Sequence, residues 1–160
     1  MAAHKKAFAA AVSIFLICAL TTGCGLFNDE TSKKAIFQYV EAHHDELEAF
    51  PYSAMQGNDA ARTAYIRHYL GEDTIVKDVY RYNDGVLQFD CGGTGIVASS
   101  TYSGFYYSAD DLPFAFEFSN EAVFRETQEG RFEWKNERGN KAIVTERILP
   151  HWFYYHMLWS

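Results

Sequence analysis

The sequence predicts an α+β domain in which one or two N-terminal helices pack on a mostly antiparallel sheet of five to seven strands. Three observations predict this fold class. Apolar side chains recur at helical spacing before Pro51, they alternate with polar ones after Thr74, and aromatic residues make up 17% of the chain. Alternating, aromatic-rich segments favour strands, and helices on one face of an antiparallel sheet are the α+β arrangement.

The first helix is expected over residues 33 to 50, because helical spacing gathers apolar side chains on one stripe and Pro51 then follows. The stripe consists of Ile36, Val40, His43, Leu47 and Phe50. A second, shorter helix is expected over residues 58 to 70, with Asn58 or Asp59 as its N-cap and Gly71 at its end. Both helices therefore have a face suited to a shared core.

Strands are expected where apolar and polar residues alternate between turn signals. They cover residues 74–82, 86–91, 101–107, 114–118, 131–136 and 141–149, followed by a last strand in HWFYYHMLW. Asn83-Asp84-Gly85 is expected to turn a hairpin, whereas Gly92-Gly93-Thr94-Gly95 is expected to be a loop. We find no internal repeat and no second domain boundary in the sequence, so residues 33–160 are expected to form a single domain.

The first 23 residues have the layout of a secretory signal peptide. His4-Lys5-Lys6 is a short basic start, and residues 7–20 are an uncharged, almost wholly apolar run of 14 residues. Thr21, Thr22 and Gly23 are small. A membrane-spanning helix needs about 20 apolar residues, so the shorter run indicates a cleaved leader.

Residues 20–24, Leu-Thr-Thr-Gly-Cys, resemble the lipobox of bacterial lipoproteins, with Thr21 where Leu, Val or Ile is usual. The resemblance implies cleavage before Cys24 and lipidation of its thiol, with acyl chains such as palmitate. Two acyl chains anchor a protein stably. The implied organisation is a signal peptide over 1–23, a tether over 24–32 and the domain over 33–160, at the extracytoplasmic face of the cell membrane. Ordinary cleavage with free secretion, or an uncleaved anchor, are the alternatives.

The charge balance excludes some classes of partner. Loss of Lys5 and Lys6 with the leader would leave 12 basic against 21 acidic residues, a formal charge of −9. Nucleic-acid-binding proteins carry basic patches, and docking on anionic lipid also needs positive charge. We therefore expect no nucleic acid partner, and contact with the membrane through the lipid anchor alone.

The tyrosines Tyr102, Tyr106 and Tyr107 are the candidate ligand-binding residues. Period-two alternation puts Tyr102 and Tyr106 on one face of the expected strand, and Phe105 and Tyr107 on the other. Exposed contiguous aromatic patches mark binding sites, and a cell-wall glycan or an envelope protein would suit such a surface. The alternative is that these rings only pack in the sheet under the helix.

Cys91 is a candidate nucleophile, because Gly92-Gly93 after it could supply backbone N–H groups to an oxyanion. It shares a strand face with Leu87 and Phe89, however, and filling a small apolar site is the alternative. We expect no catalytic residues, no cofactor and no metal site. His44 and Glu48, four residues apart on a helix, provide only two ligands, whereas zinc needs three or four.

The C-terminal half brings a second resemblance. GIVASSTYSGFYYSADDLP and TERILPHWFYYHMLW are similar to small uncharacterised exported proteins of Gram-positive bacteria, which adds no catalytic motif. We therefore expect a membrane-anchored envelope lipoprotein that acts as a binding or interaction module rather than as an enzyme. One alternative is a cell-envelope hydrolase or thiol enzyme that uses Cys91. The other is an inhibitor or immunity-type protein, suggested by a cystatin-like outline.

Overall fold

The computed structural model describes residues 29–54, 58–83, 85–96, 99–116 and 122–160. The expected signal peptide and Cys24 lie outside these ranges. The described helices are α2 (Asp29–Ala42), α3 (His44–Glu48) and α4 (Asp59–Leu70), with a 3-10 turn over Tyr52–Ala54. The strands are β1 (Asp78–Asn83), β2 (Val86–Ile96), β3 (Ser99–Ser108), β4 (Arg125–Gln128), β5 (Arg131–Lys135), β6 (Lys141–Leu149) and β7 (Trp152–Trp159). The α+β class is confirmed.

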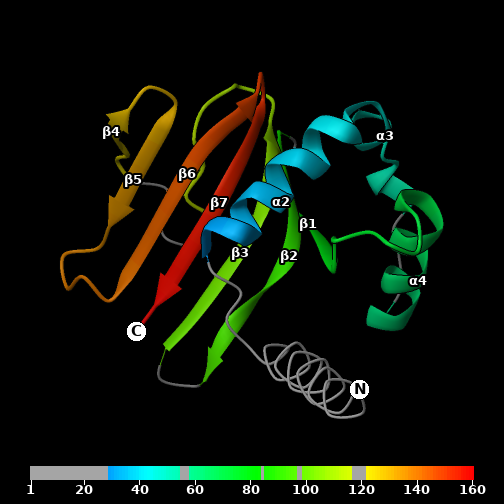
Figure 1. Cartoon of the computed structure of the whole chain (residues 1–160), viewed down its shortest axis with the longest axis horizontal. Coiled ribbons are helices and arrows are strands. Elements are labelled where there is room, and N and C mark those ends of the chain that lie inside the picture. Colours follow the sequence, from blue (N-terminus) through cyan, green and yellow to red (C-terminus); the bar gives the residue numbers. More distant parts are fainter. Residues whose placement is uncertain (1–28, 55–57, 84, 97–98, 117–121) are drawn as a thin grey trace, which may run out of the picture.

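The seven strands form one antiparallel sheet with the order β1-β2-β3-β7-β6-β5-β4. Figure 1 shows β7 in the middle of this sheet, between β3 and β6, and α2 lying across one face. The helix contacts β3, β6 and β7. The helices therefore cover one face of the sheet and leave the opposite face to other parts of the chain.

The core under the helices is built from large rings and aliphatic side chains. Phe89 of β2 and Phe105 of β3 stack with their ring centroids 4.8 Å apart, and Trp152 of β7 lies beside both rings. The helices add the apolar stripe expected from the sequence, in which Ile36, Val40 and Leu47 are buried. Burial of this apolar surface is the main term that stabilises the helices on the sheet.

The expected helix over residues 33 to 50 is divided in two. His43 has φ −116° and ψ 21°, outside helical values, and α3 then starts and ends at Glu48. Phe50 is still buried, because the turn before Pro51 returns it to the core. The other helix agrees with the prediction, since the Asn58 side chain accepts a hydrogen bond of 3.1 Å from the Ala61 N–H as its N-cap.

One strand prediction and one loop prediction are wrong. Residues 114 to 116 form no strand, and Phe116 has φ +52°; Phe118 lies outside the described residues. Phe114 and Phe116 instead pack on the sheet face opposite the helices, against Tyr106 and Phe153. The expected loop over residues 92 to 95 belongs to β2, because its backbone continues to pair with β3 up to Ile96.

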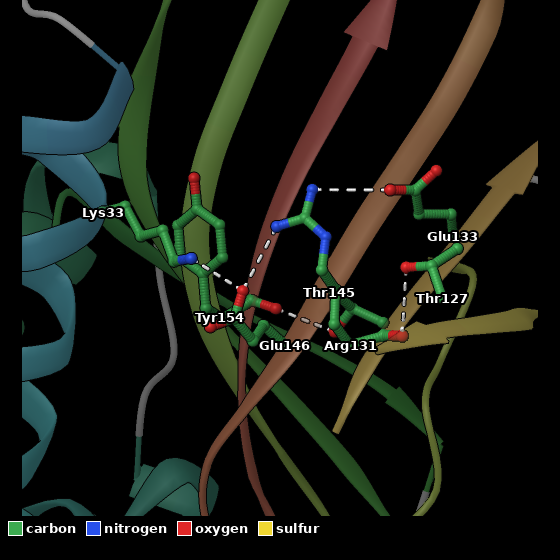
Figure 2. Close-up of polar contacts among 7 residues, drawn as sticks. All are labelled: Lys33, Thr127, Arg131, Glu133, Thr145, Glu146 and Tyr154. Carbon is green, nitrogen blue, oxygen red and sulfur yellow. Dashed lines mark hydrogen bonds and ion pairs between the residues drawn. The ribbon is translucent and has the colours of Figure 1, made fainter. Parts of the chain in front are cut away.

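A half-buried ion-pair network joins α2 to the far half of the sheet. Figure 2 shows Glu146 of β6 between Lys33 of α2 and Arg131 of β5. The Lys33 Nζ–Glu146 Oε2 distance is 2.7 Å, and Arg131 also contacts Glu133 at 3.4 Å. The network therefore adds polar contacts between α2, β6 and β5 to the apolar packing of the helix on the sheet.

Candidate functional site

A cleft of about 350 Å³ opens on the sheet face opposite α2. We call it the tyrosine cleft. Its lining comes from β1, β2, β3, β7 and the segment after β3. The lining residues are Tyr80, Tyr82, Gln88, Asp90, Tyr102, Phe116, Tyr155, Met157 and Trp159. Its volume lies at the lower end of the range of about 300 to 1,000 Å³ that is usual for small-ligand sites.

Strand periodicity explains why these residues share a face. Alternate residues of a strand point to the same side of the sheet, so Gln88 and Asp90 of β2 lie on one side, as do Tyr155 and Met157 of β7. Register then aligns the strands, because Asp90 pairs with Gly104, and Gly104 pairs with Tyr155. The Asp90 carboxylate of β2 and the Tyr155 phenol of β7 thus lie together above Gly104 of β3.

Gly104 leaves the space in which the Asp90 carboxylate and the Tyr155 phenol lie together. A Cβ atom at this position would lie 2.8 Å from the Tyr155 hydroxyl and would collide with the Phe89 carbonyl oxygen. Because glycine has no side chain, the Tyr155 ring can cross β3 and reach residues of β2. The glycine therefore shapes the floor of the cleft, and its requirement is steric.

A β-bulge places the carboxylate. The register between β2 and β3 shifts between Asp90 and Gly92, and Gly92 has φ +108°, which other residues rarely adopt. The Gly92 N–H donates a hydrogen bond of 2.8 Å to Asp90 Oδ1. Bulges commonly re-aim a side chain beside a functional site, and here the bulge fixes one oxygen of Asp90.

The floor contains an unsatisfied acceptor. Gln88 Nε2 donates a hydrogen bond of 2.7 Å to the Tyr155 hydroxyl, and both residues are buried. Gln88 Oε1 is buried as well and has no hydrogen-bond partner among the described residues. Leaving a buried acceptor unpaired costs about 1 to 3 kcal/mol, so a donor supplied from the cleft would be stabilising.

Burial also disfavours charge on the floor. The pKa of Asp90 is raised, chiefly by burial and in part by Asp78, although the Gly92 N–H, Lys77 and the Tyr155 hydroxyl act in the opposite direction. Burial, with Asp78 and Asp90 nearby, raises the pKa of Tyr80 to about 12. The Tyr80 phenol therefore stays neutral, and the carboxylate lies in a poorly hydrated place.

The rim of the cleft is aromatic and exposed. Tyr80, Tyr82, Tyr102 and Trp159 retain between 36% and 42% of their accessible surface. The Arg62 guanidinium lies 5.9 Å from the centroid of the Tyr80 ring, and Lys141 Nζ lies 4.5 Å from that of Trp159. Exposed rings around a polar floor can stack on a flat ligand while the floor makes hydrogen bonds.

The structure separates the three tyrosines that the sequence singles out. Tyr102 lines the tyrosine cleft and is 42% exposed. Tyr106 is on the same face but fully buried, and its hydroxyl contacts Thr145 Oγ1 at 2.8 Å and accepts a hydrogen bond from the Phe114 N–H. Tyr107 lies on the helix-covered face, where its ring packs against Trp152.

Sequence reasoning missed Gln88, Asp90 and Tyr155 as site residues. A weak signal was available, because Gln88 and Asp90 were predicted to share the strand face opposite Leu87 and Phe89. Two polar side chains on that face look like a solvated edge until the register puts Tyr155 beside them.

Cys91 lies in a separate hollow of about 470 Å³ on the helix-covered face. Ser103 and His156 line the same hollow, and Ser103 Oγ lies 2.9 Å from His156 Nδ1. Burial is the main cause that raises the pKa of the Cys91 thiol, and the nearby charge of Asp90 raises it further. A nucleophilic cysteine needs a lowered pKa, so the surroundings of Cys91 hold it as the protonated thiol.

Within the described ranges, no group of three or more His, Cys, Asp or Glu side chains is arranged to hold a metal ion. His44 Nε2 and Glu48 Oε1, the pair noted in the sequence, are 3.4 Å apart on α3. No helix in the described part of the chain is both long and apolar enough to cross a membrane. Comparison with models of protein families, with curated proteins and with solved structures gives no match.

Proposed function

We propose that the chain is a binding protein of the bacterial cell envelope, anchored through Cys24, and that it binds its ligand in the tyrosine cleft. The observation that carries this proposal is the buried Gln88 Oε1, which has no partner in the described residues at the floor of a cleft with an aromatic rim. A ligand that donates a hydrogen bond there would satisfy an acceptor that folding leaves unpaired.

The chemistry of the cleft favours a glycan as the ligand. Gln88 Oε1 and the Asp90 carboxylate offer acceptors on the floor, which suits a ligand with several O–H or N–H donors. Tyr102 and Trp159 expose ring surface on which the flat face of a sugar can stack. None of the nine lining residues is cationic, which disfavours anionic ligands. Glycans of the cell wall would be within reach of a lipid-anchored domain.

The binding test uses three tetrasaccharides and a matched pair of variants. Cellotetraose, the N-acetylglucosamine tetramer and a tetrasaccharide released from peptidoglycan are titrated into the protein, and tryptophan fluorescence and calorimetry follow binding. Tyr102→Ala should weaken binding about tenfold, because a lost stacking contact costs on the order of 1 to 1.5 kcal/mol. The control is Tyr69→Ala, which removes a tyrosine of similar exposure from α4, outside the cleft. Equal affinity of both variants would place binding outside the cleft.

The anchor has an independent test. The intact mass of the protein from the membrane fraction should match residues 24–160 plus a diacylglyceryl group, with or without a further acyl chain. An unmodified mass would remove Cys24 from the proposal, and a diffusible role would replace the anchored one.

A further inference from the structure

The tyrosine cleft contains a carboxylate without a cation among its lining residues. Asp90 is the one charged residue of the nine. Two cations beside the rim have other partners: Arg62 contacts Asp78 at 2.6 Å and Asp59 at 3.2 Å, and Lys141 Nζ lies 4.5 Å from the centroid of the Trp159 ring. Lys77 acts on Asp90 electrostatically, but it lines the hollow on the other face. The cleft therefore presents a negative charge that its own lining does not neutralise.

From these features we infer that the ligand carries a protonated primary amine, which binds Asp90 and Gln88 on the floor of the tyrosine cleft. The inference rests on the proposed function and narrows its ligand from any glycan to an amine-bearing one. A primary ammonium has three N–H donors, whereas a hydroxyl has one. The floor offers acceptors on two residues, Gln88 Oε1 and the Asp90 carboxylate, which lie on one face of β2.

The rings of the cleft strengthen this preference. Tyr80, Tyr82 and Tyr102 line the cleft around the carboxylate, and the face of an aromatic ring attracts a cation through its quadrupole. Rings also limit the access of water, so an ion pair with Asp90 is less screened than one at an open surface. The same burial that raises the pKa of Asp90 makes a cationic partner favourable.

The position of Asp90 is fixed before a ligand arrives. The bulge and the Gly92 N–H hold Oδ1, and the Tyr155 hydroxyl interacts with the carboxylate from β7. Two charged groups act on it, both from β1 and the residue before that strand. Asp78 of β1 opposes the negative charge of Asp90, and Lys77, before β1, favours it. The Asp90 carboxylate is therefore already positioned when an ammonium binds, which favours affinity.

The test compares cellotetraose with its derivative in which primary amines replace the primary hydroxyls. The two have the same rings and linkages, and the derivative is cationic at neutral pH. The full chain, in mild detergent, should bind the amine about tenfold more tightly or better. Asp90→Asn should reduce that ratio to near one, because the amide keeps an acceptor oxygen but carries no charge. Asp73→Asn removes an equal charge from an exposed position outside the cleft and should preserve the ratio.

Each outcome separates the inference from the function that it rests on. The wild-type protein could bind both sugars with equal affinity, and Tyr102→Ala could weaken the binding of both. That result would overturn the amine inference and leave a glycan-binding cleft. A preference for the amine that survives in Asp90→Asn, with the variant folded by circular dichroism, would also overturn it. Binding of neither sugar, nor of the peptidoglycan fragment, would overturn the proposed function itself.

Discussion

Gln88 and Tyr155 meet across an intervening strand: Gln88 Nε2 on β2 donates a hydrogen bond of 2.7 Å to the hydroxyl of Tyr155 on β7. The strand between them is β3, and Gly104 lies where the Tyr155 ring crosses it. Three strands therefore hold the floor of the tyrosine cleft as one unit, and a change in any of these three residues should alter it.

Gly104→Ala should destabilise the protein by about 3 kcal/mol, because the added methyl group collides with the Phe89 carbonyl and displaces Tyr155. Urea unfolding measures the change. The control is Gly139→Ala, at a turn where a Cβ atom meets nothing within 4 Å but φ is +68°; it should cost about 1 kcal/mol. If the two substitutions cost the same, the steric account of Gly104 is wrong.

Asp90→Asn should raise the midpoint of thermal unfolding at neutral pH, because burial disfavours the charged carboxylate and the amide is neutral. Folding raises the pKa of Asp90, so the stability it contributes is full below the unfolded-state pKa and is lost as pH rises through the folded-state pKa. The stability of the variant relative to that of the wild type should therefore increase as pH rises from acid to neutral. A lower midpoint at neutral pH would mean that hydrogen bonds to the carboxylate outweigh its burial.

Asp111→Asn should have the opposite dependence on pH. Burial alone would raise the pKa of Asp111, but the His151 N–H and the Arg147 guanidinium outweigh it and lower the pKa. The resulting stability is present above the unfolded-state pKa and is lost as pH falls through the folded-state pKa. The variant should be less stable than the wild type at neutral pH, and the two should converge in acid. A constant difference across the pH range would exclude this linkage.

The Cys91 thiol should react slowly with a disulfide reagent in the folded protein at neutral pH, because burial raises its pKa and little thiolate is present. The chain for this test carries Cys18→Ser and Cys24→Ser, so that Cys91 is its one remaining cysteine. Unfolding in guanidinium should accelerate the reaction by about a hundredfold or more, as the pKa returns to its usual value near 8.5. Fast reaction of the folded chain would bring the thiol-enzyme alternative back.

Local patterns predicted the elements well where packing and pattern agree. The period of two correctly separated Phe105 from Tyr106, since the former packs under the helices and the latter on the opposite face. The same period of two wrongly predicted a strand at Phe114 and Phe116. A segment that packs on the face of a sheet also needs apolar side chains, so its pattern resembles that of a strand. The glycines of residues 92 to 95 suggested a loop, yet a Cβ at Gly93 would collide with the Thr101 carbonyl of the paired strand.

The site was harder to predict than the fold, because it depends on register between strands distant in sequence. Tyr102 could be proposed from its own strand, but Gln88 and Tyr155 are 67 residues apart. Their contact exists only because β7 pairs with β3 and the residue between them is a glycine. No pattern within one strand carries that information.

The central place of β7 has a consequence for how the chain reaches its native state. Before this strand docks, β1–β3 and β4–β6 are two half-sheets that share no backbone hydrogen bonds in the final order. Each half then presents an open edge, at β3 and at β6, to any other extended chain. The joining strand is rich in aromatic residues and is the last of the seven to be synthesised. Assembly of the sheet is thus a late, long-range event, and protection of the open edges by a chaperone would matter most in the interval before it.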